Sequence, residues 1–119
     1  MKKTVVLGAT PNPERYAYLA TQRLAKYGYE VVPVGIKKGS IGNLEIQQGE
    51  PMLEEVDTIT LYLGAEHQRP AYDYILSLHP KRIIFNPGAE NPELSKMANA
   101  QGIETVEGCT LVMLSIGVY

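Results

Sequence analysis

The sequence predicts an α/β fold in which helices cover both faces of a five-stranded parallel sheet, giving three layers. Strand-like and helix-like segments alternate along the whole chain. The strand-like segments are short, apolar and rich in β-branched residues, and they lack the polar alternation of a half-exposed sheet. Because crossovers between parallel strands are right-handed, we expect a doubly wound, Rossmann-like order.

The first third of the chain predicts a strand, a helix and a second strand. Thr4–Leu7 is the first strand. A helix follows from about Glu14 to Tyr27, with apolar residues spaced by three and four and Gly28 as its C-terminal cap. Val31–Val34 is the second strand, and its internal Pro33 indicates a sheet edge or a strand end.

The middle of the chain begins with a long, glycine-rich loop over Lys37–Pro51, of a kind that is often functional. Asp57–Leu63 is the third predicted strand. A helix then starts near Gln68 or Pro70, because proline is well tolerated in a first helical turn. Arg82–Phe85 is the fourth strand.

The last helix-rich part opens with an N-terminal cap at Asn91 and a proline, Pro92, at the first helical position. This helix ends at Gly102, and Ile103–Val106 is the fifth strand. Thr110–Ile116 is apolar throughout; a helix and a strand both fit, and we favour a helix.

Size and composition indicate one domain over residues 1–119, with a net charge of −2 and no overall basic field for nucleic acid. An anion site must therefore be local. The chain opens almost directly on a strand and has no apolar run long enough to span a membrane. The single cysteine, Cys109, fits a reducing compartment, so we expect a cytoplasmic protein without signal peptide.

The turn after the first strand is the leading candidate for a phosphate site. Gly8 allows a sharp turn and a close approach to the backbone, although a plain turn explains it too. Thr10 and Asn12 either donate to a phosphate or cap the following helix. Arg15, placed one turn into that helix, suits a bidentate phosphate contact; a solvated surface arginine is the alternative. Tyr16 is expected in the core.

The residues after the second strand indicate which kind of nucleotide the site would bind. Sites for an unphosphorylated adenosine ribose place an acidic residue about 20 residues past the glycines. Here Lys37 and Lys38 stand at that place, which favours a nucleotide with an extra phosphate over a solvated loop. The G-x-G-x-x-G pattern is absent, because Thr10 and Pro13 occupy the later glycine positions.

Further candidates follow the later strands. Gly88, in the turn Asn86-Pro87-Gly88, either lets a ligand approach or simply forms the turn. We expect Cys109 to be a buried, inert thiol and His67 to be exposed without a role. No catalytic triad, carboxylate pair or metal-ligand spacing emerges, so we predict no catalytic and no metal residues.

Three segments together resemble the CoA-binding domain family, over nearly the whole chain: Gly8-Ala9-Thr10-Pro11-Asn12-Pro13-Glu14-Arg15-Tyr16, Tyr29-Glu30-Val31-Val32-Pro33-Val34 and Gly108-Cys109. The family comprises small Rossmann-like proteins similar to the nucleotide-binding domain of the succinyl-CoA synthetase α subunit. The resemblance implies coenzyme A as ligand. Its diphosphate would bind the loop Gly8–Asn12, which includes Ala9, and Arg15.

The resemblance also implies that Lys37 and Lys38, beyond Pro33, face the 3′-phosphoadenosine. The chain departs from the family at two places. Gly35-Ile36 stands where many members have Asn-Pro, and Asn86–Glu90 replaces the usual aromatic and glutamine residues. The phosphohistidine of the synthetase lies in a domain that this chain lacks, so its ligase chemistry is not implied.

Three functions agree with these residues. The first is a stand-alone module that binds CoA, an acyl-CoA or a CoA disulfide without catalysis of its own. The second is an NADP-type nucleotide-dependent enzyme or sensor, and the third is a ligand-free scaffold for protein interactions. Under each, the apolar tail Thr110–Tyr119 favours a homodimer in which a second copy covers it.

Overall fold

A computed structural model describes residues 2–119 and confirms the predicted fold class. Five parallel strands form the main sheet in the order β2-β1-β5-β6-β7. Their bounds are β1 Lys3–Leu7, β2 Glu30–Val34, β5 Thr58–Leu61, β6 Arg82–Phe85 and β7 Glu104–Glu107. The fourth-strand prediction is correct at both ends, and the others differ by one to three residues.

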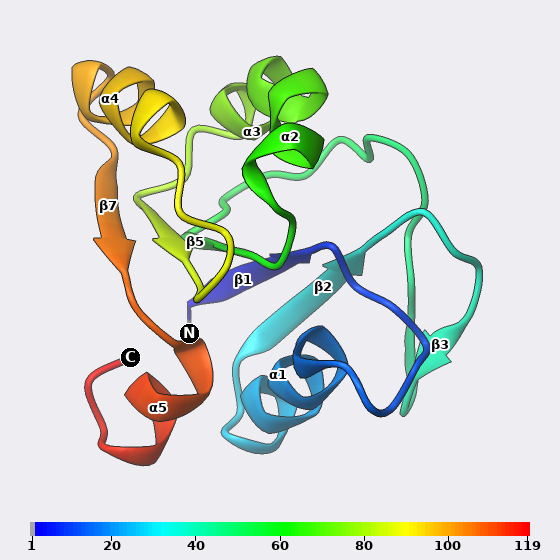
Figure 1. The fold of residues 1–119 in the computed structure, drawn as a ribbon. Coiled ribbons are helices and arrows are strands. Elements are labelled where there is room, and N and C mark those ends of the chain that lie inside the picture. The colour runs from blue at the N-terminus through cyan, green and yellow to red at the C-terminus, as the bar shows by residue number, and fades with distance from the viewer. Residues whose placement is uncertain (1) are drawn as a thin grey trace.

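The order of the strands reverses next to β1, which lies between β2 and β5 (Figure 1). In the register, Leu7 lies opposite both Val34 and Leu61, and Leu61 lies opposite Phe85. Four strands therefore end at one level. The region outside the carboxyl ends of β1 and β5 is the topological switch point, where open α/β sheets bind ligands.

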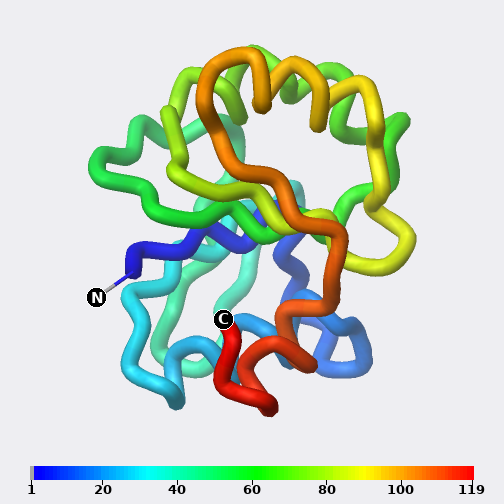
Figure 2. The backbone as a smooth tube through the Cα atoms, turned by 90° about the vertical axis from the view of Figure 1, so that its left-hand side faces the viewer, coloured from blue at the N-terminus to red at the C-terminus, as the bar shows by residue number. Residues whose placement is uncertain are grey.

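Helices cover both faces of the sheet, as predicted. On one face lie α1 Tyr16–Lys26 and α5 Thr110–Ser115, and on the other lie α2 Ala65–Gln68, α3 Tyr72–Ser77 and α4 Pro92–Ala100, with a short 3₁₀ turn Arg69–Ala71 between α2 and α3 (Figures 1 and 2). Successive residues of β1 belong to the two cores: Val5 is in the cluster that contains Ile75, and Val6 is in the cluster that contains Leu24. Burial on both faces explains why the strands lack polar alternation.

β2 is an edge strand, which confirms the inference from Pro33. The edge is covered by the segment that we call the strap, residues 46–56, which leads from a small hairpin to β5. Gln47 N–H donates to the Pro33 carbonyl at 2.9 Å, and Gly35 N–H donates to the Gln47 carbonyl at 3.0 Å. The predicted irregular loop thus contains the hairpin β3 Ser40–Ile41 and β4 Leu44–Glu45, followed by a segment that protects the sheet edge.

Local signals predicted the last helices well. Asn91 caps α4, since its Oδ1 accepts from Leu94 N–H at 3.1 Å, and Pro92 is the first helical residue. The apolar run that begins at Thr110 is a helix. The helix after β5 begins earlier than predicted, at Ala65, in three short pieces. In the described residues, no helix has the length and apolar character needed to cross a membrane.

Candidate functional site

A cavity of about 750 Å³ lies at the switch point, within the size range of small-molecule sites. Its lining comes from the loops that follow β1, β2, β5 and β6, from the first turn of α1, from α2 and α3, and from the strap. Seven of the nine predicted site residues line it: Gly8, Ala9, Thr10, Asn12, Arg15, Lys37 and Gly88. Residues from four separate loops thus meet around one space.

Gly8 has a structural task that the sequence did not show. Its φ of 100° favours glycine, and a Cβ there would lie 2.8 Å from the carbonyl oxygen of Tyr62. The N–H groups of Gly8 and Ala9 both donate to the Val34 carbonyl at 2.9 Å. These two N–H groups therefore join the ends of β1 and β2 and are not free for a ligand.

Thr10 and Asn12 both stabilise the loop through their side-chain oxygens. Thr10 Oγ1 accepts from Asn12 N–H at 3.2 Å, and Asn12 Oδ1 accepts from Glu14 N–H at 3.0 Å. Both bonds lie in the turn before α1, which begins at Tyr16, so the alternative that these residues cap the helix is wrong. The Thr10 hydroxyl proton and the Asn12 amide group keep their donor capacity toward the cavity.

Arg15 is the N-terminal cap residue of α1, with extended backbone angles (φ −91°, ψ 146°), rather than a residue one turn into the helix. No side chain within residues 2–119 caps this helix, so N–H groups of its first turn remain available at the cavity. Tyr16 is 71% exposed and lines the cavity, so its predicted place in the core is wrong.

The loop after β2 lies directly against the loop after β1. A Cβ at Gly35 would stand 2.1 Å from the Ala9 carbonyl oxygen, so only glycine allows this approach. Lys37 lines the cavity, whereas Lys38 is exposed outside the lining. Pro33 is buried within β2 and also lies outside it. The structure does not bring these last two predicted site residues to the cavity.

The loop after β6 combines an open glycine with a structural asparagine. Gly88 has a φ of 91°, and a Cβ there would meet no atom within 4 Å, so the space beside it is open. Asn86 is buried: its Nδ2 donates to Thr60 Oγ1 at 2.7 Å and to the Leu61 carbonyl at 2.9 Å. Its Oδ1 accepts from Thr110 N–H at 2.9 Å. Asn86 therefore ties β6, β5 and α5 together and presents no polar atom to a ligand.

Several lining residues were not predicted as site residues. Glu50 comes from the strap, Tyr62 and Leu63 come from the end of the predicted third strand, and Ala71 and Tyr74 come from the α3 region. His67 is exposed, as predicted, and also lies in the lining. The only sequence signal for Glu50 was its place in a long glycine-rich loop.

Two further polar groups lie near the sheet end. Burial raises the pKa of Tyr62 well above its ordinary value, and the nearby Cys109 adds to the shift. The Tyr62 hydroxyl is buried and has no hydrogen-bond partner within residues 2–119. Cys109 is half-buried at the start of α5, outside the cavity lining. In the part of the chain that the structure describes, no group of three potential metal ligands occurs.

Fold and cavity together define a doubly wound α/β protein with a ligand-sized cavity at its switch point. The chain belongs to the CoA binding domain family, whose model matches residues 2–115 and confirms the resemblance inferred from the sequence. Comparison with curated proteins finds no significant match.

Solved structures of the same fold include a crystal structure of an uncharacterized protein that is 55% identical to this chain, with a TM-score of 0.98. That match covers 100% of this chain and 98% of the other. A hypothetical protein from Pyrococcus horikoshii OT3 is 23% identical, with a TM-score of 0.87 and coverage of 97% and 82%.

A dinucleotide forming acetyl-coenzyme A synthetase from Ca. Korarchaeum cryptofilum, solved with phosphate and ADP, has a TM-score of 0.71 at 17% identity. The match covers 90% of this chain and 25% of the synthetase. At this identity, and at that of the Pyrococcus horikoshii protein, the likeness shows the fold alone.

Proposed function

We propose that this protein binds coenzyme A in the cavity at the switch point, without catalysis of its own. The observation that carries the proposal is the N-terminus of α1, which opens into the cavity without a side-chain cap and with Arg15 at its cap position. Exposed N–H groups and the helix dipole favour a bound anion, and a guanidinium adds a charge-assisted, bidentate contact. Membership of the CoA binding domain family supports the diphosphate of CoA as that anion.

The adenosine end of the ligand is assigned to the loop after β2. Lys37 lines the cavity there, on the loop after β2, whereas Arg15 follows β1. Its ammonium group suits the 3′-phosphate that distinguishes CoA. Ile36, which is 90% exposed and also lines the cavity, supplies an apolar surface beside it. Lys38 contributes charge only at a distance in this arrangement.

Binding without catalysis is supported by the way the nearby polar side chains are used. Asn86 and Thr110 are engaged in buried structural hydrogen bonds. Burial raises the pKa of Tyr62, so this phenol stays neutral and is a poor base at ordinary pH. The lining offers phosphate donors and apolar contacts, which are the groups needed to hold a cofactor.

Calorimetric titration of the purified protein tests the proposal, with CoA as ligand and with NADP and NAD as controls. Binding of CoA in the micromolar range or tighter, with neither control binding, is the expected result. Binding of NADP without CoA would favour an NADP-dependent enzyme or sensor instead. If none of the three binds, the scaffold hypothesis replaces the present one.

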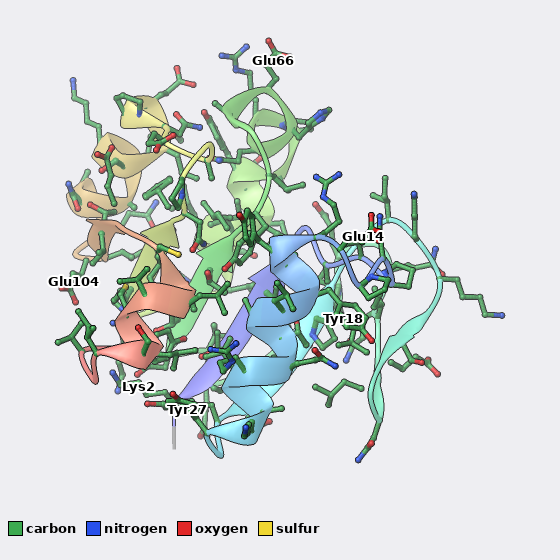
Figure 3. The ribbon with its side chains drawn as sticks, turned by 60° about the horizontal axis from the view of Figure 1, so that its bottom comes forward. Lys2, Glu14, Tyr18, Tyr27, Glu66 and Glu104 are labelled. Atoms are coloured by element: carbon green, nitrogen blue, oxygen red, sulfur yellow. The ribbon has the colours of Figure 1, made fainter. Side chains whose placement is uncertain are left out.

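Homodimerisation and a cytoplasmic location stay predictions. The tail is partly covered by the chain itself, because Leu114 and Tyr119 are buried, whereas Val112, Ile116 and Val118 are more than half exposed. Figure 3 shows α5 lying beside α1; Val112 belongs to α5, and Ile116 and Val118 follow it. We expect light scattering after size exclusion to give twice the chain mass of 13.1 kDa; a monomer mass would contradict the dimer.

A further inference from the structure

The loop after β2, residues 35–39, is held by the strap at both of its ends. Where the loop begins, Gly35 N–H donates to the Gln47 carbonyl at 3.0 Å. Where it ends, Ile46 N–H donates to the Gly39 carbonyl at 2.9 Å. Ile46 is only 3% exposed and belongs to the core cluster that also contains residues of α1. The first residues of the strap are therefore anchored in the core, and they fix both ends of the loop.

A side chain of the strap holds the middle of the same loop. Gln48 Nε2 donates to the Ile36 carbonyl at 3.0 Å, and Ile36 directly precedes Lys37. The Ile36 side chain is 90% exposed, so its packing does not fix this part of the loop. The neighbouring Gln47 side chain makes no hydrogen bond within residues 2–119, so Gln47 acts through its main chain alone. The amide group of Gln48 is thus the contact nearest to Lys37 in the sequence.

The loop after β2 also packs against the loop after β1. A Cβ at Gly35 would lie 2.1 Å from the Ala9 carbonyl oxygen, and a Cβ at Gly39 would lie 2.8 Å from the Cβ of Pro11. These two contacts stand on either side of Lys37 in the sequence. The main chain that carries Lys37 therefore has a fixed position relative to the loop that leads into α1.

We propose that Gln48 is a positioning residue for Lys37, and that this positioning makes the site select a 3′-phosphate over a 2′-phosphate on the adenosine ribose. The inference rests on the proposed function, in which Arg15 contacts the diphosphate and Lys37 contacts the ribose phosphate. Two ligands that differ only in the position of this phosphate carry the same charge, so charge alone does not distinguish them. Selection requires that the cation is held where only one of the two phosphates reaches it.

The contacts of the loop meet this requirement. A lysine side chain is long and flexible, so on a loose loop it would follow the phosphate to either position. Here the main chain around Lys37 is bonded at Gly35, at Ile36 and at Gly39, which limits the space that the ammonium group can reach. Of these three bonds, only the one to Ile36 is made by a side chain and can be removed by substitution without altering the main chain.

The test measures, by calorimetry on the full chain, the affinities for CoA and for its synthetic isomer with the phosphate at the 2′ position. In the unaltered protein, CoA should bind about 10-fold more tightly than the isomer, because only CoA makes the charge-assisted contact. Gln48→Ala should lower this ratio by about 3-fold, because the released loop lets Lys37 follow either phosphate. Equal affinities for the two isomers in the unaltered protein, or an unchanged ratio in Gln48→Ala, would overturn the proposal.

Two controls separate positioning from general support of the cavity. Gln47→Ala removes the adjacent exposed side chain, which makes no hydrogen bond within residues 2–119, and should leave the ratio unchanged. The affinity for dephospho-CoA should stay nearly constant in Gln48→Ala, because this ligand lacks the ribose phosphate. A loss of affinity that is equal for CoA, its isomer and dephospho-CoA would contradict the positioning role.

A double variant shows whether Gln48 acts through Lys37. In a Lys37→Ala background, Gln48→Ala should leave the ratio of the two isomers unchanged, because the positioned side chain is already absent. A ratio that falls by the same factor with and without Lys37 would show that Gln48 acts on another group, and the proposal would be wrong.

The outcomes distinguish this inference from the proposed function. If CoA does not bind to the unaltered protein, the proposed function fails and the positioning role fails with it. If CoA binds but no more tightly than its 2′ isomer, CoA binding stands and the positioning role alone is wrong.

Discussion

The guanidinium carbon of Arg82 lies 4.6 Å from the centre of the Tyr119 ring, so the last residue of the sequence covers a buried cation at the amino end of the sheet. Arg82 is 9% exposed, and its Nε donates to Thr58 Oγ1 at 3.1 Å. The Thr58 hydroxyl in turn donates to Asp57 Oδ1 at 2.7 Å. The tail thus lies at the amino ends of β5 and β6, whereas the cavity lies at the carboxyl ends of the strands. It contributes to stability and lies away from the proposed ligand.

Tyr119→Ala should lower the free energy of unfolding by about 3–4 kcal/mol, because it removes a buried ring and uncovers Arg82. Tyr119→Phe should cost about 1 kcal/mol, since it loses the hydrogen bond of 2.6 Å between the tyrosine and threonine hydroxyls of Tyr119 and Thr4. Urea denaturation measures both. Val118→Ala, at a side chain that is 59% exposed, is the control and should change stability by less than about 0.5 kcal/mol.

Arg15→Ala should weaken CoA binding by roughly 1.5–3 kcal/mol, the value of a charge-assisted contact to a phosphate. The free energy of unfolding should change by less than about 0.5 kcal/mol, because no ion pair or side-chain hydrogen bond of Arg15 occurs within residues 2–119. Calorimetry and urea denaturation give the two numbers. Arg23→Ala, an exposed arginine in the last turn of α1, is the matched control. Equal effects of the two substitutions on binding would argue against a phosphate at this helix.

Lys37→Ala should reduce the affinity for CoA by about 1–2 kcal/mol and leave the affinity for dephospho-CoA nearly unchanged, because the lost contact is to the 3′-phosphate. Lys38→Ala is the neighbouring control, since Lys38 lies outside the cavity lining, and should cost less than about 0.5 kcal/mol. Both ligands are titrated against both variants. An unaltered ratio of the two affinities in Lys37→Ala would remove Lys37 from the phosphate site.

Stability should fall as the pH rises above the ordinary tyrosine value of about 10. Burial raises the pKa of Tyr62 and of Tyr119 in the folded state, so the unfolded chain releases these protons first. The sign follows: stability is complete below the unfolded pKa and is lost as the pH increases beyond it. Thermal unfolding between pH 8 and about pH 11.5 measures the loss.

Tyr62→Phe should make this alkaline loss smaller and cost less than about 0.5 kcal/mol at pH 7, because the hydroxyl that it removes is buried without a hydrogen-bond partner in the described chain. Tyr16→Phe is the comparison, since its ring is 71% exposed, and it should leave the pH dependence unchanged. An alkaline loss of the same size in Tyr62→Phe and in the unaltered protein would show that Tyr62 does not contribute.

Much of the fold could be predicted because the signals are local. The strands are recognised by apolar, β-branched runs, and Asn91-Pro92 marks the start of α4 through hydrogen bonds and a φ angle set within one turn. Pro33 indicates an edge strand because its missing N–H is a property of the residue itself. The carboxyl ends of parallel strands share one sheet edge, so the general position of the site followed as well.

The details of the cavity depended on contacts between distant segments. The N–H groups of Gly8 and Ala9 are occupied because β2 brings the Val34 carbonyl beside them, and Gly35 is needed because Ala9 lies against it. Glu50 reaches the cavity because the strap is bonded to β2 at one end and to Tyr74 at the other.

The sequence by itself therefore determined the layers, the class of strand order and the loop after β1 as part of the cavity, because these arise from spacings of a few residues. Only the tertiary structure decided which N–H groups stay free and that Lys37 and not Lys38 lines the cavity. These outcomes depend on which main-chain and side-chain groups of distant segments come into contact. Such meetings are fixed by packing and hydrogen bonding between segments far apart in the chain.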